Sequence, residues 1–280
     1  MQLTIAENME GLQKALMPLM KEGKRSALVP TLGNLHDGHL ALVHAAKQHA
    51  DTVILSIFVN PRQFGALEDF GNYPRTLEAD IKKTDEAGVT IVYTPSLDDI
   101  YPEGYLTNVS VGPLGEILCG AFRPGHFDGV ATVVTKLFLR VLPHIAVFGE
   151  KDYQQLCIVR RVAYDLDIPV EVLSVPTVRE ESGLAMSSRN AYLTPEERKL
   201  APKLHETLVQ VAARLAGGVP IPDACAEGAR QLDKLGFKVE YIELREADSL
   251  NALEKFTPPA RLLAAAWLGK TRLIDNIGLE

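Results

Sequence analysis

The chain has 280 residues, of which 46% are apolar and 23% are charged, so it can bury the core of one large domain or two unequal domains. Its net charge of −7 and pI near 5.6 argue against a general nucleic-acid-binding protein, because binding a polyanion needs a basic field. Any site for a phosphate group must therefore be built locally.

No stretch of the sequence has the pattern of a targeting or membrane segment. Met1–Ile5 lacks a charged region followed by a long apolar stretch, and no window approaches the roughly 18 uninterrupted apolar residues of a membrane span. Cys119, Cys157 and Cys225 form no CxxC pair, and so sparse a set is typical of a reducing compartment. We therefore expect a cytoplasmic protein with no membrane and no nucleic-acid partner.

Short apolar strands alternate with helical patterns through residue 176. The run 26–29 predicts a buried strand that ends at Pro30, because proline has no N–H for ladder pairing. Such alternation is typical of a parallel sheet covered by helices on both faces, with ligands at the carboxyl ends of the strands. The predicted strands are 27–29, 53–59, 89–93, 145–148 and 170–174, and the predicted helices are 40–50, 77–87, 130–142 and 156–166.

A helix with a clear start follows this region. The segment 194–197 (Thr-Pro-Glu-Glu) supplies an N-cap, a proline in the first turn and a capping-box glutamate. The pair Gly217-Gly218 ends the pattern. Between them an apolar stripe predicts one buried helix face, made of Leu200, Leu204, Leu208, Val211 and Leu215.

The last part of the chain has strand patterns. Phe237, Val239 and Tyr241 alternate with charged residues, and Gly269-Lys270 is a two-residue hairpin candidate between the apolar runs 262–268 and 273–277. The sequence therefore predicts an α/β fold with two domains. Residues 1–176 would form a Rossmann-like doubly wound parallel sheet that binds the ligands, and residues 177–280 a smaller α+β domain.

The segment 29–39 joins the first predicted strand to the first predicted helix. His36 and His39 flank the start of that helix, where backbone N–H groups and the helix dipole attract phosphate oxygens. Gly33 and Gly38 let the main chain approach a ligand closely. Both imidazoles lie on nearly the same face of one turn, so both can donate to one triphosphate. An isolated HxxH pattern is more often a cap with a packed surface ring, and a metal pair is a further reading.

The wider pattern resembles a known family. The segment 36–39 (His-Asp-Gly-His) resembles the HxGH signature of the nucleotidylyltransferase superfamily. Together with its neighbours it resembles the pantothenate synthetase family, whose members are pantoate–β-alanine ligases. Five ordered blocks carry this resemblance and are far more specific than any one of them: 30–39, 58–64, 123–127, 148–155 and 183–190.

The resemblance implies an ATP-dependent condensation of (R)-pantoate with β-alanine. Pantoyl adenylate would form with loss of pyrophosphate, and the amine would then displace AMP. The small-molecule partners would be ATP, pantoate and β-alanine, with Mg²⁺ as cofactor. The family also implies a homodimer and a C-terminal domain that acts as a lid and excludes water from the labile adenylate.

The same resemblance assigns residues to ATP. His36 and His39 would contact its phosphates, with His39 as proton donor, while Lys151 and Arg189 would be the cationic catalytic residues. The segment 186–189 looks like the mobile KMSKS loop of class I aminoacyl-tRNA synthetases, although alone it reads as a solvated serine-rich turn. The implied ATP-binding residues are Leu32, Gly33, Asn34, Leu35, His36, Asp37, Gly38, His39, Gly149, Glu150, Lys151, Asp152, Val178, Met186, Ser187, Ser188 and Arg189.

Neutral side chains are assigned to the other substrates. Gln63 and Gln155 would bind pantoate, and Gln63 also β-alanine, since an amide orients a carboxylate without trapping it in an ion pair. Asn60 would hold the loop geometry, and His126 would either close over the substrates or cap a helix. Asp80 would either take part in binding Mg²⁺ or lie on a solvated helix face.

The sequence departs from the family pattern at one position, and its motifs are compatible with three other functions. Leu32 stands where the family usually has methionine, and a flexible apolar residue of similar volume should preserve a pantoate-facing wall. Another adenylyl or cytidylyl transferase would join the nucleotide to a phosphate and stop. A metal-dependent hydrolase would hold Zn²⁺ on His36 and His39, and a nonenzymatic nucleotide-binding module would only bind.

Overall fold

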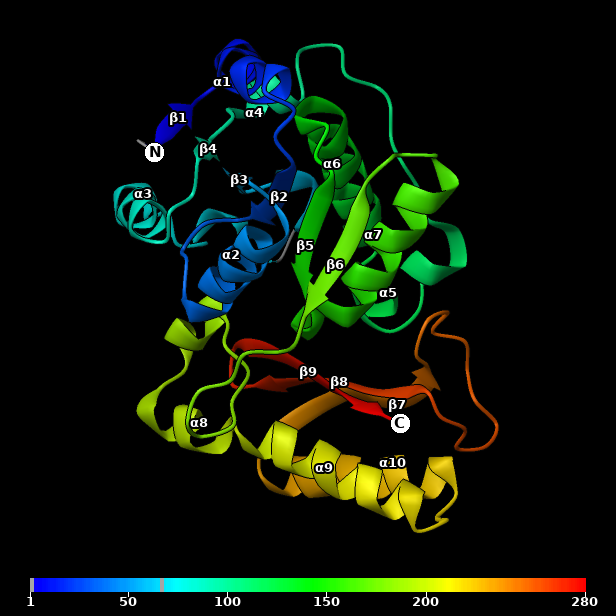
Figure 1. The fold of residues 1–280 in the computed structure, drawn as a ribbon. Coiled ribbons are helices and arrows are strands. Elements are labelled where there is room, and N and C mark those ends of the chain that lie inside the picture. The colour runs from blue at the N-terminus through cyan, green and yellow to red at the C-terminus, as the bar shows by residue number, and fades with distance from the viewer. Residues whose placement is uncertain (1–2, 66–67) are drawn as a thin grey trace. The chain divides into compact units, whose positions relative to one another are not determined.

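The computed structural model describes residues 3–65 and 68–280, and the chain separates into two compact units. The first unit comprises Met1–Glu150 and Ile158–Pro176, and the second comprises Lys151–Cys157 and Thr177–Glu280. Figure 1 shows the helices and strands of both. The division of function that the sequence predicts for 1–176 and 177–280 stays a prediction.

The first unit is built on a parallel sheet of six strands in the order β1-β4-β3-β2-β5-β6. Its order runs outward in both directions from β2, so the topological switch point lies between β2 and β5. This arrangement confirms the predicted doubly wound fold. The strands are β1 (Thr4–Ala6), β2 (Ser26–Thr31), β3 (Thr52–Ile57), β4 (Ile91–Tyr93), β5 (Ile145–Gly149) and β6 (Glu171–Val175).

Both faces of this sheet are buried, as expected when helices cover a parallel sheet on both sides. On one face Val29 and Leu55 pack against α2, whose Val43 is fully buried. Leu28 and Ile54, which point to the opposite face of the sheet, are equally buried. The helices of this unit are α1 (Met9–Lys21), α2 (Asp37–His49), α3 (Leu77–Glu86), α4 (Leu97–Ile100), α5 (Cys119–Phe122), α6 (His126–Val141) and most of α7 (Tyr153–Asp165).

The prediction that Pro30 ends its strand is wrong. Strand β2 continues to Thr31, and Pro30 pairs with Ser56 of β3. The Thr31 carbonyl accepts a hydrogen bond from the Phe58 N–H, so the backbone N–H and C=O of Thr31 face β3. The backbone groups of the preceding residue, Pro30, therefore face β5, the strand on the other side of β2. Pairing with that neighbour, β5, stops at Leu28, so the missing N–H of Pro30 costs no ladder bond.

Three helices begin earlier than the apolar periodicity predicts. The structure starts α2 at Asp37, α6 at His126 and α7 at Tyr153, whereas the periodic patterns begin at 40, 130 and 156. The first turn of each helix is largely polar, so it carries little of the apolar signal from which helices are predicted. These polar first turns hold several of the predicted site residues.

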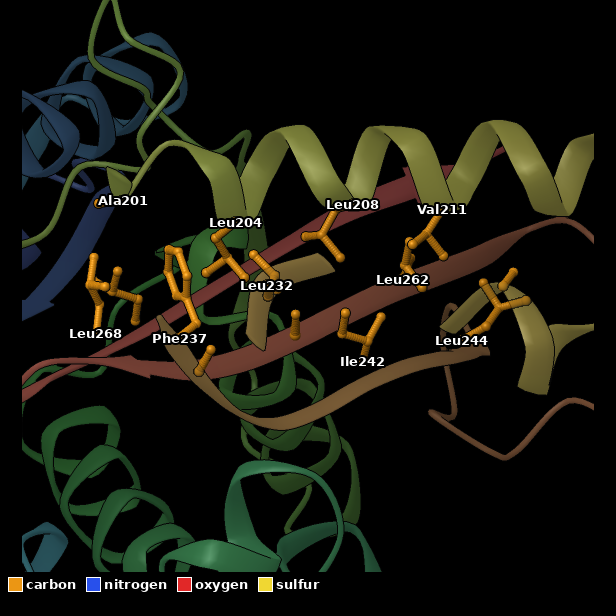
Figure 2. Close-up of a cluster of buried hydrophobic side chains, with 14 of the residues drawn as sticks. Ala201, Leu204, Leu208, Val211, Leu232, Phe237, Ile242, Leu244, Leu262 and Leu268 are labelled. Atoms are coloured by element: carbon orange, nitrogen blue, oxygen red, sulfur yellow. The ribbon is translucent and has the colours of Figure 1, made fainter. Parts of the chain in front are cut away.

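The second unit packs helices on one face of an antiparallel sheet in the order β7-β8-β9. Figure 2 shows its core, where Leu204, Leu208 and Val211 of α9 meet Leu262 of β8 and Ile242 of β7. The turn at Gly269 joins β8 to β9 and confirms the predicted hairpin. The elements are α8 (Pro195–Leu200), α9 (Lys203–Ala216), α10 (Ile221–Lys234), β7 (Phe237–Glu246), β8 (Ala260–Leu268) and β9 (Thr271–Leu279).

The predicted single helix after Thr194 is two helices. Its capping box is confirmed, because the Thr194 hydroxyl accepts from the Glu197 N–H at 3.2 Å and the Glu197 carboxylate accepts from the Thr194 N–H at 2.9 Å. The helix then stops at Leu200, since Pro202 has no N–H with which to continue the helical hydrogen bonds, although Ala201 keeps helical backbone angles. A second helix restarts at Lys203 and buries the rest of the predicted stripe.

The predicted alternation of Phe237, Val239 and Tyr241 on one sheet face is also corrected. The register shifts between Val239 and Tyr241, where Glu240 is the extra residue of a bulge. After the bulge, Ile242 faces the helices, and Tyr241 lies on the opposite face.

Four helices and one strand were not predicted from the sequence, and two of these helices, α4 and α5, have only four residues each. Helix α1 contains Pro18, which interrupts its helical pattern, and β1 has only three residues. Helix α10 packs on α9 through small residues, since a Cβ on Gly228 would lie 2.5 Å from Val211 Cγ2. Small residues allow this close approach but give little hydrophobic periodicity. Among the helices of the described residues, none is long and apolar enough to cross a membrane.

Candidate active site

His36 and His39 cap the N-terminus of α2. His36 is the N-cap residue, and its Nδ1 accepts a hydrogen bond from the Gly38 N–H at 3.1 Å. The Nδ1 of His39 accepts from the His36 N–H at 3.3 Å. The two rings are stacked with centroids 4.1 Å apart. Each imidazole therefore satisfies one of the backbone N–H groups that a helix start leaves unpaired.

These caps decide the proton position on each ring. Because a backbone N–H can only donate, Nδ1 of each ring must be the acceptor, and the neutral imidazole carries its hydrogen on Nε2. Both histidines are partly buried. The arrangement thus combines two Nε2–H donors with the positive end of the α2 dipole, which is a favourable environment for a phosphate or another oxyanion.

The loop before α2 is held by a buried carboxylate on α3. Asp80 is 1% exposed, and its two oxygens accept from the Asn34 and Leu35 N–H groups, each at 2.8 Å. The Thr76 hydroxyl donates to the same carboxylate at 3.1 Å. Lys83, one turn along α3, donates to the Leu35 carbonyl at 2.5 Å. Helix α3 therefore holds both polar groups of the Leu35 backbone.

Gly33 is required where this loop turns. Its φ is +84°, and a Cβ there would lie 3.0 Å from Ile57 Cγ2 and 3.2 Å from Asp80 Oδ2. The solvated-face reading of Asp80 is therefore wrong, because Asp80 is buried and both of its oxygens accept hydrogen bonds, and its part in binding Mg²⁺ stays a prediction. Within residues 3–65 and 68–280, no group of three or more His, Cys, Asp or Glu side chains is arranged to hold a metal ion.

Asn60 organises the segment that carries Gln63. Asn60 is fully buried, and its Oδ1 accepts from the Arg62 N–H at 3.3 Å and from the Tyr101 hydroxyl at 3.0 Å. Its Nδ2 donates to Gln63 Oε1 at 3.1 Å and to the Gly129 carbonyl at 3.0 Å. Since Asn60 binds the oxygen of the Gln63 amide, that amide presents its NH₂ group as the donor on its other side.

His126 holds the same segment through its backbone. It is the first residue of α6, and its Nδ1–H donates to the Gln63 carbonyl at 2.7 Å. Its Nε2 is then the acceptor for Arg123 Nη1, 3.0 Å away. Arg123 in turn forms a two-pronged ion pair with Glu68 at 2.7 and 2.6 Å. Arg123 and Glu68 were not predicted as site residues, although Arg123 lies in one of the motif blocks.

Glu68 stays ionised within this cluster. Burial alone would raise the pKa of Glu68, but the hydrogen bond and positive charge of Arg123 outweigh it, and the pKa lies below the ordinary value of 4.5. The charged Arg123 keeps the neutral His126 in one tautomer and one orientation. The first unit thus brings Asn60, Gln63 and His126 together in one hydrogen-bonded group.

The second unit holds Lys151, Gln155 and the serine–arginine segment. Lys151 lies in the short 3₁₀ turn Glu150–Asp152, its side chain is 21% exposed, and its Nζ is 3.7 Å from Asp152 Oδ1. Its carbonyl accepts from Asn276 Nδ2 at 2.9 Å. Gln155 is partly exposed in the first turn of α7, whereas the adjacent Gln154 is only 4% exposed. Of the two glutamines, Gln155 is the one that keeps an accessible amide.

A short antiparallel hairpin precedes the serine–arginine segment. Arg179 pairs with Ala185, and the Met186 N–H donates to the Val178 carbonyl at 2.9 Å. The Ser187 hydroxyl then accepts from the Arg189 N–H at 3.2 Å and caps the 3₁₀ turn Ser188–Tyr192. Val178, Met186 and the Ser187–Arg189 segment thus belong to one folded piece.

The comparisons with known proteins agree with these motifs. The pantoate-beta-alanine ligase family profile matches residues 4–278. The sequence is 55% identical to the pantothenate synthetase of Paramagnetospirillum magneticum over 92% of this chain and 92% of that protein. It is 51% identical to the pantothenate synthetase of Roseobacter denitrificans over 99% of this chain and 98% of that protein.

Solved structures show the same fold. The pantothenate synthetase of Thermus thermophilus has a TM-score of 0.92 at 45% identity, covering 98% of each chain. The pantoate-beta-alanine ligase of Francisella tularensis, complexed with beta-gamma ATP and beta-alanine, has a TM-score of 0.85 at 35% identity and covers 99% of this chain and 97% of that one. The chain therefore belongs to the pantoate–β-alanine ligase family.

Proposed function

We propose that this ligase works in two steps through a pantoyl-adenylate intermediate. In the first, a carboxylate oxygen of pantoate attacks the α-phosphorus of ATP, the bond from that phosphorus to the bridging oxygen breaks, and pyrophosphate leaves. In the second, the amine of β-alanine attacks the acyl carbon, the bond to AMP breaks, and the nitrogen loses a proton. The adenylate is needed because a free carboxylate has no good leaving group for amide formation.

The observation that carries this proposal is the histidine cap on α2. Both rings accept through Nδ1 and so offer Nε2–H donors at the positive end of a helix. Donors fixed before the reaction stabilise the negative charge that develops on pyrophosphate without reorganising. We assign His39 as the residue that donates a proton or hydrogen bond to the departing oxygen, and His36 as its partner at the phosphates.

The cations of the second unit would complete the phosphate site. The Lys151 ammonium and the Arg189 guanidinium neutralise phosphate oxygens, and the Ser187 and Ser188 hydroxyls add hydrogen bonds. The remaining ATP contacts would come from 32–39, 149–152, Val178 and Met186. Closure of the 177–280 domain over 1–176 would exclude water from the adenylate, which hydrolysis would otherwise destroy.

Neutral amides would hold pantoate. The orientation of the Gln63 amide by Asn60 supports a role as hydrogen-bond donor to the pantoate carboxylate. Gln155 would bind the same substrate, Gln63 would also contact β-alanine, and Leu32 would form an apolar wall. His126 would act through the Gln63 backbone that it holds. This arrangement would direct the carboxylate toward phosphorus, and positioning of this kind supplies a large part of catalysis.

Mg²⁺ would belong with ATP as part of the substrate. The described residues offer no cluster of three or more acidic, histidine or cysteine ligands, and the Asp80 oxygens are already hydrogen-bonded. This suits an ion that is held mainly by phosphate oxygens and water, where it would neutralise phosphate charge. We assign Asp80 to the loop before α2.

An exchange experiment tests the intermediate. With ATP, Mg²⁺ and pantoate but no β-alanine, the enzyme should incorporate labelled pyrophosphate into ATP, because adenylate formation is reversible. Catalytic release of AMP should require both pantoate and β-alanine. Pantoate-independent exchange would contradict the pantoate assignment, and a complete reaction without any pyrophosphate exchange would contradict the adenylate.

The remaining proposals concern the protein as a whole. We expect it to act in the cytoplasm, where ATP is available, and as a homodimer. Sedimentation equilibrium should then give twice the chain mass of 30.6 kDa, and a mass of 30.6 kDa would contradict the dimer.

A further inference from the structure

Strand β9 carries two adjacent buried polar residues that bind different segments. Asp275 is 4% exposed and Asn276 is 3% exposed. Neighbouring residues on a strand point to opposite faces of the sheet. Asp275 therefore shares the face of Leu273, which packs in the core beneath the helices, and Asn276 lies on the other face. Figure 1 shows β9 in the small sheet, with α9 and α10 below it.

Asp275 holds the hairpin that leads to the serine–arginine segment. Its two oxygens accept from Arg179 Nη1 at 2.7 Å and from Nη2 at 2.8 Å. Arg179 Nη1 also donates to the Gly183 carbonyl at the tip of the hairpin, at 3.1 Å. The turn Ser188–Tyr192 packs beside β9. Burial and the charge of Arg179 lower the pKa of His205, the other neighbour of Asp275, so Arg179 is the cationic partner at neutral pH.

The far end of the hairpin is fixed by a second buried side chain. Asn190, 5% exposed, donates through Nδ2 to the Ala185 carbonyl and to Glu180 Oε1, each at 3.1 Å. Glu180 is in turn paired with Arg198 at 2.8 Å. The segment between Ala185 and Asn190, which includes Arg189, is thus bridged at its base to the hairpin.

Asn276 holds the main chain of Lys151. Its Nδ2 donates to the Lys151 carbonyl at 2.9 Å, and its Oδ1 accepts from Arg261 Nε at 2.6 Å. The Arg261 guanidinium lies 4.0 Å from the centroid of the Tyr153 ring, two residues after Lys151. The Asn276 amide therefore attaches the backbone of Lys151 to β9. A cation–π contact attaches the start of α7 to Arg261 of β8, which is itself bonded to Asn276.

We propose that Asp275 and Asn276 are positioning residues that fix the Lys151 and Arg189 segments relative to each other. The proposal rests on the function proposed above, in which both cations bind the phosphates of ATP. Consecutive Cα atoms across a trans peptide bond are about 3.8 Å apart, so the two segments are attached to neighbouring points of one strand. Strand β9 would then present an ammonium and a guanidinium to one triphosphate as a single unit, although neither Asp275 nor Asn276 touches the ligand.

The first test removes the donor to Lys151. Asn276→Asp keeps the shape and the acceptor for Arg261 but places an oxygen against the Lys151 carbonyl, and Asn276→Ala removes the amide without adding charge. Each should lower kcat/KM for ATP in pantoate-dependent pyrophosphate exchange by about tenfold, since a buried polar group loses its partner. The KM for pantoate should change less than the KM for ATP, because Gln63, one of the two glutamines proposed to bind pantoate, lies outside the segment that Asn276 holds.

Double-mutant cycles test whether each residue acts through its own segment. In a Lys151→Ala background, Asn276→Asp should have little further effect on ATP kinetics, whereas Asp275→Asn should retain its effect. In an Arg189→Ala background, Asp275→Asn should have little further effect on ATP kinetics, whereas Asn276→Asp should retain its effect. Arg179→Lys, which cannot form the two-pronged pair and changes a side chain that is 20% exposed, replaces Asp275→Asn if that variant does not fold.

Glu240→Gln is the matched control. Glu240 is an 11% exposed carboxylate on the same sheet that accepts from Arg272 at 2.7 Å and from the Trp267 ring N–H at 2.6 Å. The Glu240→Gln variant should lower the unfolding free energy about as much as Asn276→Asp does, and it should leave kcat/KM for ATP unchanged. If Lys151→Ala and Arg189→Ala leave exchange unaltered, the proposed function of these cations fails, and the positioning role with it. If those variants are impaired but Asn276→Asp behaves like Glu240→Gln, only the positioning role is overturned.

Discussion

At the scale of single residues, the ring nitrogen that each histidine uses determines its chemistry. The Nδ1 atoms of His36 and His39 accept from backbone N–H groups at 3.1 and 3.3 Å, so the helix cap and the proposed catalysis use opposite edges of the same ring. An asparagine side chain places its amide near the position of Nδ1, and a glutamine places its amide near that of Nε2. The two functions of one histidine can therefore be separated by substitution.

His39→Asn should keep the cap and lose catalysis. Its Oδ1 can accept from the His36 N–H, so we expect unfolding free energy within about 0.5 kcal/mol of wild type, while pyrophosphate exchange falls roughly 100-fold or more. His39→Gln should show the converse, with a loss of about 1 kcal/mol in stability and part of the activity retained. Urea unfolding and exchange kinetics on both variants measure this. Equal activity of His39→Asn and wild type would remove His39 from the mechanism.

Asp80 supports the proposed phosphate site through the main chain of the loop before α2. It holds the Asn34 and Leu35 N–H groups from a different helix, and the loop it holds leads directly into the histidine cap. Asp80→Asn keeps the shape but replaces one accepting oxygen with an NH₂ group that faces a donor.

We expect Asp80→Asn to destabilise the protein by about 1–3 kcal/mol, the cost of leaving a buried N–H unpaired. The matched control is Asp85→Asn, an exposed position on the same helix, which should change stability by less than about 0.5 kcal/mol. Urea denaturation at pH 7 compares the two. Equal stability of both variants would show that the Asp80 carboxylate does not hold the loop.

At the scale of elements, polar first turns join the sheet to the site. Helix α2 begins with the histidine cap, and α6 begins with His126, which is fixed by the Arg123–Glu68 pair. Neither α2 nor α6 is held at this end by a conventional Ser, Thr, Asp or Asn cap. The residues that start these helices are therefore the same residues that are proposed to meet or organise the substrates.

The Glu68 ion pair predicts an acid-sensitive part of the fold. Because the folded pKa of Glu68 lies below 4.5, ionised Glu68 stabilises the folded state above its unfolded pKa, and this contribution is lost as the pH falls through the folded pKa. The unfolding free energy of wild type should exceed that of Glu68→Gln at pH 7, and the difference should shrink below pH 4.5. Glu78→Gln, at an exposed position, should show no such difference. A difference independent of pH would show that Glu68 acts through packing and not through its charge.

At the scale of the whole molecule, each compact unit organises its own part of the proposed chemistry. The first unit holds the histidine cap and the Asn60–Gln63–His126 group. The second unit contains residues 177–280 and also takes the segment Lys151–Cys157, so Lys151 and Gln155 belong to it by contact although they lie within the predicted first domain. The two predicted phosphate-binding cations, Lys151 and Arg189, are therefore carried by one unit.

The sequence was sufficient for most of the longer strands and helices, the doubly wound class, the capping box at Thr194 and the family. These depend on local periodicity or on contiguous motifs, which neighbouring residues encode. Its errors have local physical causes. The strand was predicted to end at Pro30 because the sequence does not reveal that β5 stops pairing with β2 at Leu28. The bulge at Glu240 moves the following side chains to the opposite face of the sheet from the one that simple alternation predicts.

Only the tertiary structure decided which nitrogen of each histidine is protonated, what Asp80 does, and which residues hold Lys151. The Asn34–Asp80 bond spans 46 residues, and the Lys151–Asn276 bond spans 125. Such partners have no fixed spacing in the sequence, because they meet only after the sheets have brought distant loops and strands together. Sequence by itself therefore predicted the groups proposed to do the chemistry, and the fold determined how they are held.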